Sequence, residues 1–285
     1  MIAPPRCPVV MGTVRVEPGL WEIYLERGGA VFDTAYHYGA ETERAVGRLV
    51  ERLGLRDRVT ILGKGAHSPN CFPEVVASQL DESLDNLRTS HVDLYLLHRD
   101  NPDVPIAEFA DVLHREVVAG RARTIGASNW TRARYETFND YAASHDLTPF
   151  TVLSNQLSLA EMQEPVWEGC LRADTAWHAR TQTPLLAWSP QARGFFAGRP
   201  DDDELRASWI TPANVERRAR ADELARRMNA LPVTVALAWV LGQPFPVQVV
   251  VGPRDASELD ACLASLDIAL TDDDRRWLEA EETAG

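Results

Sequence analysis

The sequence predicts one (β/α)₈ barrel of the TIM type across residues 1–285, with a long loop after the seventh strand and a C-terminal helix. Short apolar runs alternate with amphipathic segments eight times along the chain, as strands followed by helices do. Each apolar run ends in polar residues, and such barrels carry their functional side chains at the carboxyl ends of the strands. A chain of 285 residues with 45% hydrophobic content is long enough to bury the core of this fold.

The stretch VFDTAYHYG at residues 31–39 shows this pattern most clearly. Its two leading apolar residues follow Gly28 and Gly29 and indicate a buried strand that stops at Asp33, with Tyr38 five residues later. Together with similar runs it gives the predicted strands, at 7–13, 31–35, 59–62, 92–97, 122–127, 151–153, 184–188 and 246–251. Apolar residues at helical spacing predict the helices between them, at 20–27, 41–53, 74–87, 106–119, 132–143, 165–180 and 256–266.

The alternation changes after the seventh predicted strand. Residues 191–214 contain two glycines, two prolines and three consecutive aspartates. So many residues that interrupt helices and strands are unusual in a loop that only joins a strand to a helix, so we expect a functional loop there. Helices at 215–229 and 232–242 are predicted to follow it, and a terminal helix at 272–280 with Thr271 as its N-terminal cap.

An open doubly wound sheet is the alternative fold. It would require a glycine-rich turn after an early strand, and the sequence contains no GxGxxG motif. We therefore predict the barrel. If a dinucleotide binds, we expect it to be held by a structural element other than a GxGxxG turn.

Composition and charge restrict the function classes. The cysteines form no CxxC motif, so the sequence predicts neither a zinc knuckle nor a disulfide framework, and no metal site. The formal net charge of −13 argues against nucleic acid or an anionic membrane as partner. No run approaches the roughly 20 apolar residues of a membrane span, and the start MIAPPRCPVV lacks signal-peptide features. We expect a cytoplasmic protein that acts on a small molecule, and make no prediction of its oligomeric state.

Blocks of residues at successive strand ends resemble the signatures of the aldo-keto reductase family. The blocks are FDTAYHYG at 32–39 with Glu43 and Gly47 behind it, Lys64, YLLHRD at 95–100, GRARTIGASNW at 120–130, SNQLSL at 154–159 and WSPQARGFF at 188–196. They occur in the family's order, and the resemblance covers nearly the whole chain. It implies a (β/α)₈ barrel that reduces carbonyl groups with a nicotinamide cofactor bound without a Rossmann domain, in agreement with the missing GxGxxG motif.

The resemblance implies a catalytic tetrad of Asp33, Tyr38, Lys64 and His98. Hydride delivery to a carbonyl carbon builds negative charge on the oxygen, which a proton donor must meet. Tyr38 would be this donor, with its pKa moved from about 10 toward the working range by the charge of Lys64. Asp33 would hold Lys64 in place, and His98 would orient and polarise the substrate oxygen.

The family positions that contact the cofactor also follow predicted strands. By resemblance, Ser128, Asn129 and Gln156 would hold the nicotinamide carboxamide, and Trp188 would stack on the nicotinamide ring. Short polar groups suit this task because they add donors and acceptors without filling the pocket. The turn after the seventh strand would cross the pyrophosphate and supply further contacts from Ser189, Gln191 and Arg193.

After the eighth strand the sequence departs from the family pattern. Gly252 and Arg254 remain for the adenosine 2′-phosphate, but Glu258 stands where many relatives carry Arg or Gln, and Cys262 where many carry Asn. A carboxylate at position 258 would repel a 2′-phosphate, or accept a hydrogen bond from a ribose hydroxyl. We therefore expect NADP(H) to be favoured, with weaker binding than is usual in the family, and NAD(H) as the alternative cofactor.

Aromatic side chains near the strand ends predict the walls of a substrate pocket, from Tyr36, His37, Trp130, Phe195 and Phe196. This set suits an apolar aldehyde or the face of a sugar and does not separate the two. The expected function is an NADP(H)-dependent oxidoreductase that interconverts an aldehyde or ketone with an alcohol, with Tyr38 as general acid and base.

Two other functions are alternatives. A catalytically slow, nicotinamide-sensing regulatory subunit could use the same barrel, although we expect so short an N-terminal segment to disfavour partner docking. A metal-dependent hydrolase or isomerase would need clustered His, Asp and Glu ligands at strand ends, and Asp33 with His98 does not form such a cluster.

Overall fold

The strands form one closed barrel, which confirms the predicted fold class. The computed structural model describes residues 7–199 and 203–280. All neighbouring strands are parallel and follow sequence order, and β1 closes the barrel by pairing with β8. The strands are β1 Val9–Gly12, β2 Val31–Asp33, β3 Thr60–Gly65, β4 Val92–Leu97, β5 Ala122–Ser128, β6 Phe150–Ser154, β7 Leu185–Trp188 and β8 Val247–Val251.

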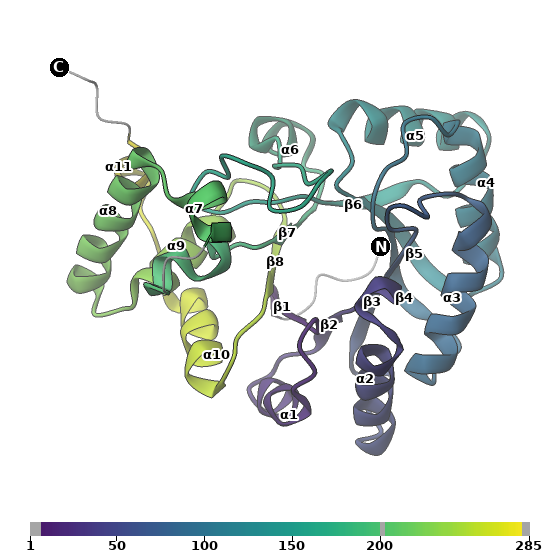
Figure 1. The fold of residues 1–285 in the computed structure, drawn as a ribbon, viewed down its shortest axis with the longest axis horizontal. Helices are drawn as coiled ribbons and strands as arrows, with labels where there is room; N and C mark the ends of the chain where they lie inside the picture. Colours follow the sequence, from purple (N-terminus) through teal and green to yellow (C-terminus); the bar gives the residue numbers. More distant parts are fainter. Residues whose placement is uncertain (1–6, 200–202, 281–285) are drawn as a thin grey trace.

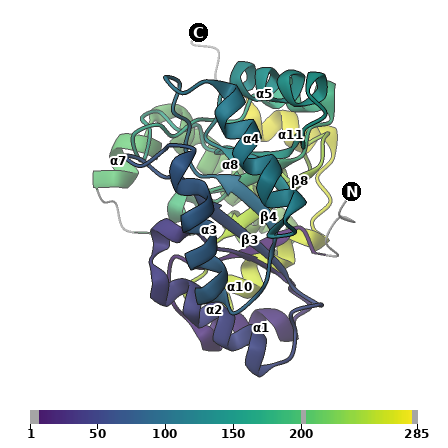
Figure 2. The ribbon, with the colours of Figure 1, turned by 90° about the vertical axis from the view of Figure 1, so that its right-hand side faces the viewer.

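Helices cover the outside of the barrel. They are α1 Pro18–Glu26, α2 Ala40–Arg52, α3 Glu74–Leu87, α4 Ile106–Val118, α5 Arg132–Ser144, α6 Thr175–Thr181, α7 Asp203–Trp209, α8 Pro212–Met228, α9 Pro232–Leu241, α10 Ala256–Leu263 and α11 Asp272–Glu279. Figure 1 shows α2 to α5 on one side and α7 to α11 on the other. Helices α2, α3 and α4 lie side by side (Figure 2). In the part of the chain that the structure describes, no helix has the length and apolarity needed to cross a membrane.

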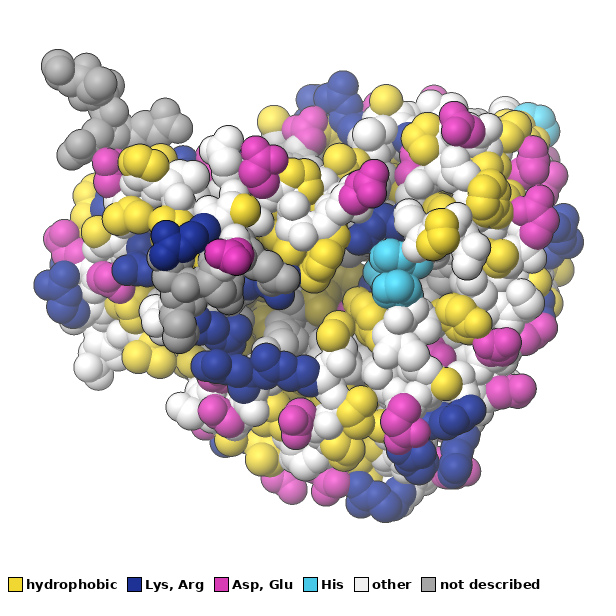
Figure 3. Space-filling model, in the orientation of Figure 1, with side chains coloured by type: hydrophobic (Ala, Val, Ile, Leu, Met, Phe, Trp, Pro, Cys, Tyr) yellow, Lys and Arg dark blue, Asp and Glu magenta, His cyan; other side chains and the backbone are white. Residues whose placement is uncertain are grey.

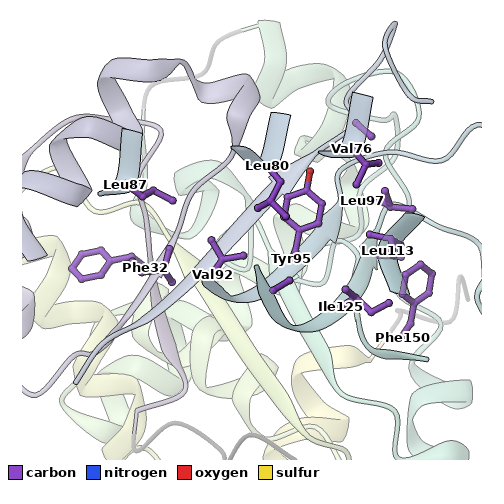
Figure 4. Packing of buried hydrophobic residues seen from close by; sticks show 14 of the residues in the cluster. Phe32, Val76, Leu80, Leu87, Val92, Tyr95, Leu97, Leu113, Ile125 and Phe150 are labelled. Carbon is purple, nitrogen blue, oxygen red and sulfur yellow. The ribbon is translucent and has the colours of Figure 1, made fainter. Parts of the chain in front are cut away.

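Two layers of apolar side chains hold the strands and helices together. The barrel interior is filled by Val10, Val31, Leu62, Leu94, Leu96, Val152 and Leu186. A second layer lies between the strands and the surrounding helices, and Figure 4 shows part of it around Phe32, Tyr95 and Phe150. Because successive strand residues point to opposite sides, one strand supplies both layers.

The helix predicted at 165–180 is wrong over its first part. Only Thr175–Thr181 is helical, and its cap is Asp174, whose side chain accepts a hydrogen bond from the backbone N–H of Trp177 (2.9 Å). The preceding residues are irregular and include Pro165 and Gly169, the latter with a φ of 74°. This segment is therefore a long loop after β6, above the end of the barrel, rather than a wall helix.

Other boundaries also differ from the sequence prediction, for example β3, which continues to Gly65 rather than ending at 62. The expected loop at 191–214 contains a 3₁₀ segment, Ala192–Ala197, and helix α7. Helix α8 begins at Pro212 rather than at 215, because the side chain of Thr211 accepts a hydrogen bond from the backbone of Asn214 (3.2 Å). The predicted cap of the last helix is confirmed, since Thr271 forms a capping box at the start of α11.

Candidate active site

Side-chain alternation directs the predicted catalytic residues into the barrel. Val31 on β2 and Leu62 on β3 belong to the interior layer. Asp33 and Lys64 come two residues later on the same strands and therefore face the same side. His98 follows the interior residues of β4 at the same spacing. Local sequence periodicity thus places three polar groups at one end of a closed barrel.

The structure brings the four predicted catalytic side chains together. The ammonium of Lys64 lies 2.6 Å from Oδ1 of Asp33 and donates a hydrogen bond to the carbonyl of Thr34 (2.9 Å). It also lies 5.0 Å from the centre of the Tyr38 ring. The rings of Tyr38 and His98 meet edge to face, with 5.7 Å between their centres. Asp33 and Lys64 are 4% and 5% exposed, so their ion pair is shielded from water.

A short 3₁₀ turn delivers Tyr38 to this group. The turn, Tyr36–Tyr38, follows β2 and ends at Gly39, whose φ of 94° favours glycine. Burial raises the pKa of Tyr38 above its ordinary value, and the charge of Lys64 opposes this rise without cancelling it. The sequence expectation of a lowered pKa thus differs from the structure, because desolvation exceeds the effect of the ammonium. The phenol is protonated at neutral pH.

The same burial acts on the three other members, and it raises the pKa of Asp33, although Lys64 opposes this rise. Burial alone would lower the pKa of Lys64, but Asp33 and Tyr38 together raise it. The pKa of His98 lies well below its ordinary value because the ring is buried and Lys64 and Arg99 are close. At neutral pH the site therefore holds a cationic Lys64 and a neutral His98. A neutral imidazole can donate one ring N–H to a substrate oxygen.

Two further histidines stand beside His98. The rings of His37 and His67 are stacked, with 3.8 Å between their centres, and His67 meets His98 edge to face at 4.7 Å. Sequence reasoning missed His67, although its position three residues after Lys64 could have indicated it. Figure 3 shows histidine side chains at the edge of a hollow in the middle of this face, with Lys or Arg side chains across it.

One cavity joins the tetrad to the other strand ends. Its volume is about 1080 Å³, and its walls include the four tetrad residues, Ser128, Asn129, Trp188, Ser189, Gln191, Arg193, Gly252 and Arg254. It therefore runs from the tetrad across the ends of β5 and β7 to the turn after β8. An extended dinucleotide would need a groove of this kind, with its reactive ring at the tetrad.

The predicted carboxamide ligands lie at different depths. Asn129 donates a hydrogen bond to Oγ of Ser128 (3.0 Å), and its Oδ1 accepts one from the backbone of Leu171 (3.2 Å). Gln156 is fully buried and donates to Oγ of Ser158 (2.9 Å). Its Oε1 has no hydrogen-bond partner among the described residues. A buried acceptor of this kind is suited to the N–H of an amide.

The aromatic wall of the cavity contains a second tryptophan. Trp188 is partly buried, and Trp167 lies 6.2 Å from it between ring centres. The guanidinium of Arg193 stands over the Trp167 ring at 5.1 Å. Trp167 comes from the irregular loop after β6, so the incorrect helix prediction concealed its position. These groups form a polar and aromatic cover beside the expected nicotinamide position.

At the end of the cavity after β8, where the sequence predicts the adenosine contacts, two arginines hold Glu258. Its carboxylate accepts hydrogen bonds from the backbone N–H and Nε of Arg254 (2.9 and 2.7 Å), and from the guanidinium of Arg199 (3.0 Å). Burial alone would raise the pKa of Glu258, but the bonds from Arg254 and the charge of Arg199 lower it. Sequence reasoning missed Arg199. Glu258 thus pairs with both of the arginines that could otherwise bind a 2′-phosphate.

The predicted substrate wall is placed differently. Of its five residues, His37 lines the cavity. Trp130 is instead fully buried in the layer outside the barrel, edge to face with Phe150, since it points away from the interior. Phe195 and Phe196 are buried in the core near α8 and α9, and the hydroxyl of Tyr36 pairs with Glu82, away from the tetrad.

Comparison with known proteins identifies the family. Residues 20–280 match the model of the aldo/keto reductase family. The aldo-keto reductase YhdN of Bacillus subtilis is 27% identical over 83% of this chain and 74% of its own length. A probable aldo-keto reductase 1 of Glycine max is 29% identical over 88% and 75%, and an NADP⁺ aryl-alcohol dehydrogenase of Phanerodontia chrysosporium is 26% identical over 95% and 77%.

A solved structure agrees with the fold. A thermostable aldo-keto reductase, crystallised with the inhibitor epalrestat, superposes with a TM-score of 0.76 over 95% of this chain and 94% of its own, at 22% identity. Both the match over residues 20–280 and the closed barrel extend across most of the sequence. The chain belongs to the aldo/keto reductase family.

Proposed function

We propose that this protein is an NADP(H)-dependent oxidoreductase that reduces an aldehyde or ketone to an alcohol, or catalyses the reverse reaction, with Tyr38 as general acid and base. The observation that carries the proposal is the buried Asp33 and Lys64 pair beside Tyr38 and His98 in one cavity. Family membership and an NADP⁺-named relative support it. The partner would be a small-molecule carbonyl or alcohol, and a cytoplasmic location remains an expectation from the sequence.

Each member of the tetrad has a distinct task. The bound nicotinamide supplies the hydride for the carbonyl carbon. Tyr38 gives its phenolic proton to the carbonyl oxygen, and its raised pKa keeps that proton in place beforehand. Lys64 stabilises the resulting phenolate, while Asp33 keeps the ammonium charged and fixed. Neutral His98 donates a hydrogen bond that orients the substrate oxygen.

The cofactor would lie along the cavity from Trp188 to the turn after β8. The short polar groups at Ser128 and Asn129, which line the cavity, suit an amide at one end. Arg254 and Arg199 suit a phosphate at the other, although Glu258 already pairs with both. Gln156 is fully buried and is not part of the cavity wall, although its Oε1 has no partner among the described residues.

The test is a steady-state assay of NADPH and NADH oxidation against a panel of aldehydes and ketones, with the alcohol identified by mass spectrometry. Sustained turnover with at least one carbonyl is expected, and NADPH should give the higher kcat/KM. A single burst of cofactor oxidation without turnover across the panel would instead favour the regulatory-subunit alternative. A preference for NADH of tenfold or more would contradict the assigned cofactor.

A further inference from the structure

Arg99 is a buried cation in the active-site cavity that the proposed reaction does not use. It follows His98 directly, is 7% exposed and lines the cavity. Among residues 7–199 and 203–280, no carboxylate forms an ion pair with it. The adjacent Asp100 pairs instead with Arg134, which lies 3.1 Å away. Within the described part of the chain, Arg99 donates hydrogen bonds only to the carbonyl of His98 (3.0 Å) and more weakly to Sγ of Cys170 (3.7 Å). A guanidinium has five N–H donors, so the protein uses only part of the hydrogen-bonding capacity of Arg99.

The surrounding groups leave this charge uncompensated. The charge of Lys64 is balanced by Asp33 at 2.6 Å. His98 and His67 both have pKa values below their ordinary value, because of burial and nearby cations, so both rings are neutral and add no charge. Glu168, from the loop after β6, also lines the cavity, but among the described residues no ion pair joins it to Arg99. Arg99 therefore leaves a positive charge at the inner end of the cavity that no carboxylate of the described residues pairs with. Buried charges in proteins are ordinarily paired or bound to a ligand of opposite sign.

Neighbouring groups hold Arg99 in place. Its carbonyl accepts hydrogen bonds from Sγ of Cys71 (2.9 Å) and from the indole of Trp130 (3.2 Å). Gly169, in the loop after β6, lies over it, since a Cβ at that position would come within 3.8 Å of Cδ of Arg99. The backbone of Arg99 is thus fixed by the barrel, its side chain is covered by the loop, and its guanidinium is held by the bonds to His98 and Cys170, as a preorganised anion site requires.

We propose that the substrate carries a carboxylate, which pairs with Arg99 while its carbonyl group faces Tyr38 and His98. This inference rests on the proposed function and names its substrate class as oxo acids or carboxyl-bearing aldehydes. The side chains of His98 and Arg99 both line this cavity, and the Arg99 guanidinium lies 3.0 Å from the carbonyl of His98, so a carbonyl at His98 and a carboxylate at Arg99 would be a few bonds from each other. The planar guanidinium matches a carboxylate in two parallel hydrogen bonds.

The test compares acids with their methyl esters. Benzoylformate and 4-carboxybenzaldehyde are assayed beside methyl benzoylformate and methyl 4-formylbenzoate, in wild type and in Arg99→Gln. For at least one pair, the acid-to-ester ratio of kcat/KM should fall at least tenfold in the variant, the loss expected for a charge-assisted hydrogen bond. Arg99→Lys should give an intermediate ratio. Arg132→Gln removes a cation that pairs with Asp174 outside the cavity, and should leave the ratio unchanged. Ratios that stay the same in Arg99→Gln would overturn the inference, even if carbonyl reduction itself is observed.

Binding of benzoate provides a second readout that does not need turnover. Because Trp167 and Trp188 line the cavity, their fluorescence can report benzoate binding. Benzoate should bind wild type at least tenfold more tightly than benzamide, and Arg99→Gln should lose this preference. If the protein binds benzoate but reduces no carbonyl, the proposed function is rejected and the anion site is retained. Equal binding of benzoate and benzamide to wild type, or tighter binding of inorganic phosphate than of benzoate, would overturn the carboxylate assignment even if the variant does not fold.

Discussion

Replacing Glu258 with Gln is expected to strengthen NADPH binding and leave NADH binding nearly unchanged. In the structure Glu258 pairs with Arg254 and Arg199, two cations at the end of the cavity where we propose that the adenosine lies. Its lowered pKa keeps the carboxylate charged at neutral pH. Glutamine preserves the size of the side chain but removes the charge that opposes a 2′-phosphate. Both arginines would then become available to that phosphate.

The magnitude follows from exposure and charge. The side chains of Glu258 and Arg199 are 23% and 25% exposed, so water screens them substantially. Two charges at a separation of roughly 6 Å in an effective dielectric of about 40 interact by about 1.4 kcal/mol. A phosphate carries more than one charge but is also screened by salt, so a gain of about 1 to 2 kcal/mol is expected. This corresponds to roughly tenfold in the dissociation constant of NADPH.

The assay is titration of tryptophan fluorescence with each cofactor in wild type and Glu258→Gln. Asp260→Asn is the matched control, because Asp260 lies on the same helix but pairs with Arg27 at 2.7 Å. The ratio of NADPH to NADH affinity should rise about tenfold in Glu258→Gln. It should stay constant in Asp260→Asn, and the gain should shrink at high salt. A ratio within twofold of wild type in Glu258→Gln would refute the assignment of this end to the 2′-phosphate.

Three other predictions follow from buried groups. Asp33→Asn leaves Lys64 buried without a counter-charge and should lower the free energy of unfolding by about 3 to 5 kcal/mol, measured in urea; a loss below 1 kcal/mol would contradict the shielded pair. Gly47→Ala places a Cβ 2.7 Å from the backbone of Leu87 and should cost about 1 to 3 kcal/mol, whereas Gly19→Ala, with open space around it, should cost nothing. The lowered pKa of His98 means that the unfolded chain takes up a proton below about pH 6.5 that the folded protein refuses, so stability falls as pH drops through that value. His98→Gln should reduce this slope without abolishing it, because His67, His91 and His178 also have lowered pKa values, and an unchanged slope would contradict a neutral His98.

Much of the fold could be predicted from local patterns. Eight apolar runs with polar ends predicted the strands, because a parallel strand buried on both faces is a short continuous apolar segment. The loop after β6 was missed since residues 165–180 contain apolar residues at intervals that also suit a helix. Its backbone conformation depends on the positive φ of Gly169, which lies close to Arg99, and on the local cap at Asp174, and neither appears in the apolar periodicity.

The candidate site was predictable where a strand end fixes the side chain and not elsewhere. Asp33, Lys64 and His98 face the cavity because alternation along a strand determines their direction. Trp130 follows the end of β5, where the chain leaves the strand, and it turned outward into the helix layer. Arg99 contacts Cys170 and Arg199 contacts Glu258 across long sequence distances, and no local pattern reveals these tertiary contacts.

In the proposed reaction Tyr38 donates the proton to the carbonyl oxygen. Tyr38→Phe tests this role through the steady-state rate of NADPH oxidation, with the carbonyl substrate that wild type turns over best and with NADPH binding followed by fluorescence. The kcat should fall about 10²- to 10⁴-fold, while the dissociation constant of NADPH should stay within about threefold of wild type. A rate near that of wild type would contradict Tyr38 as the proton donor.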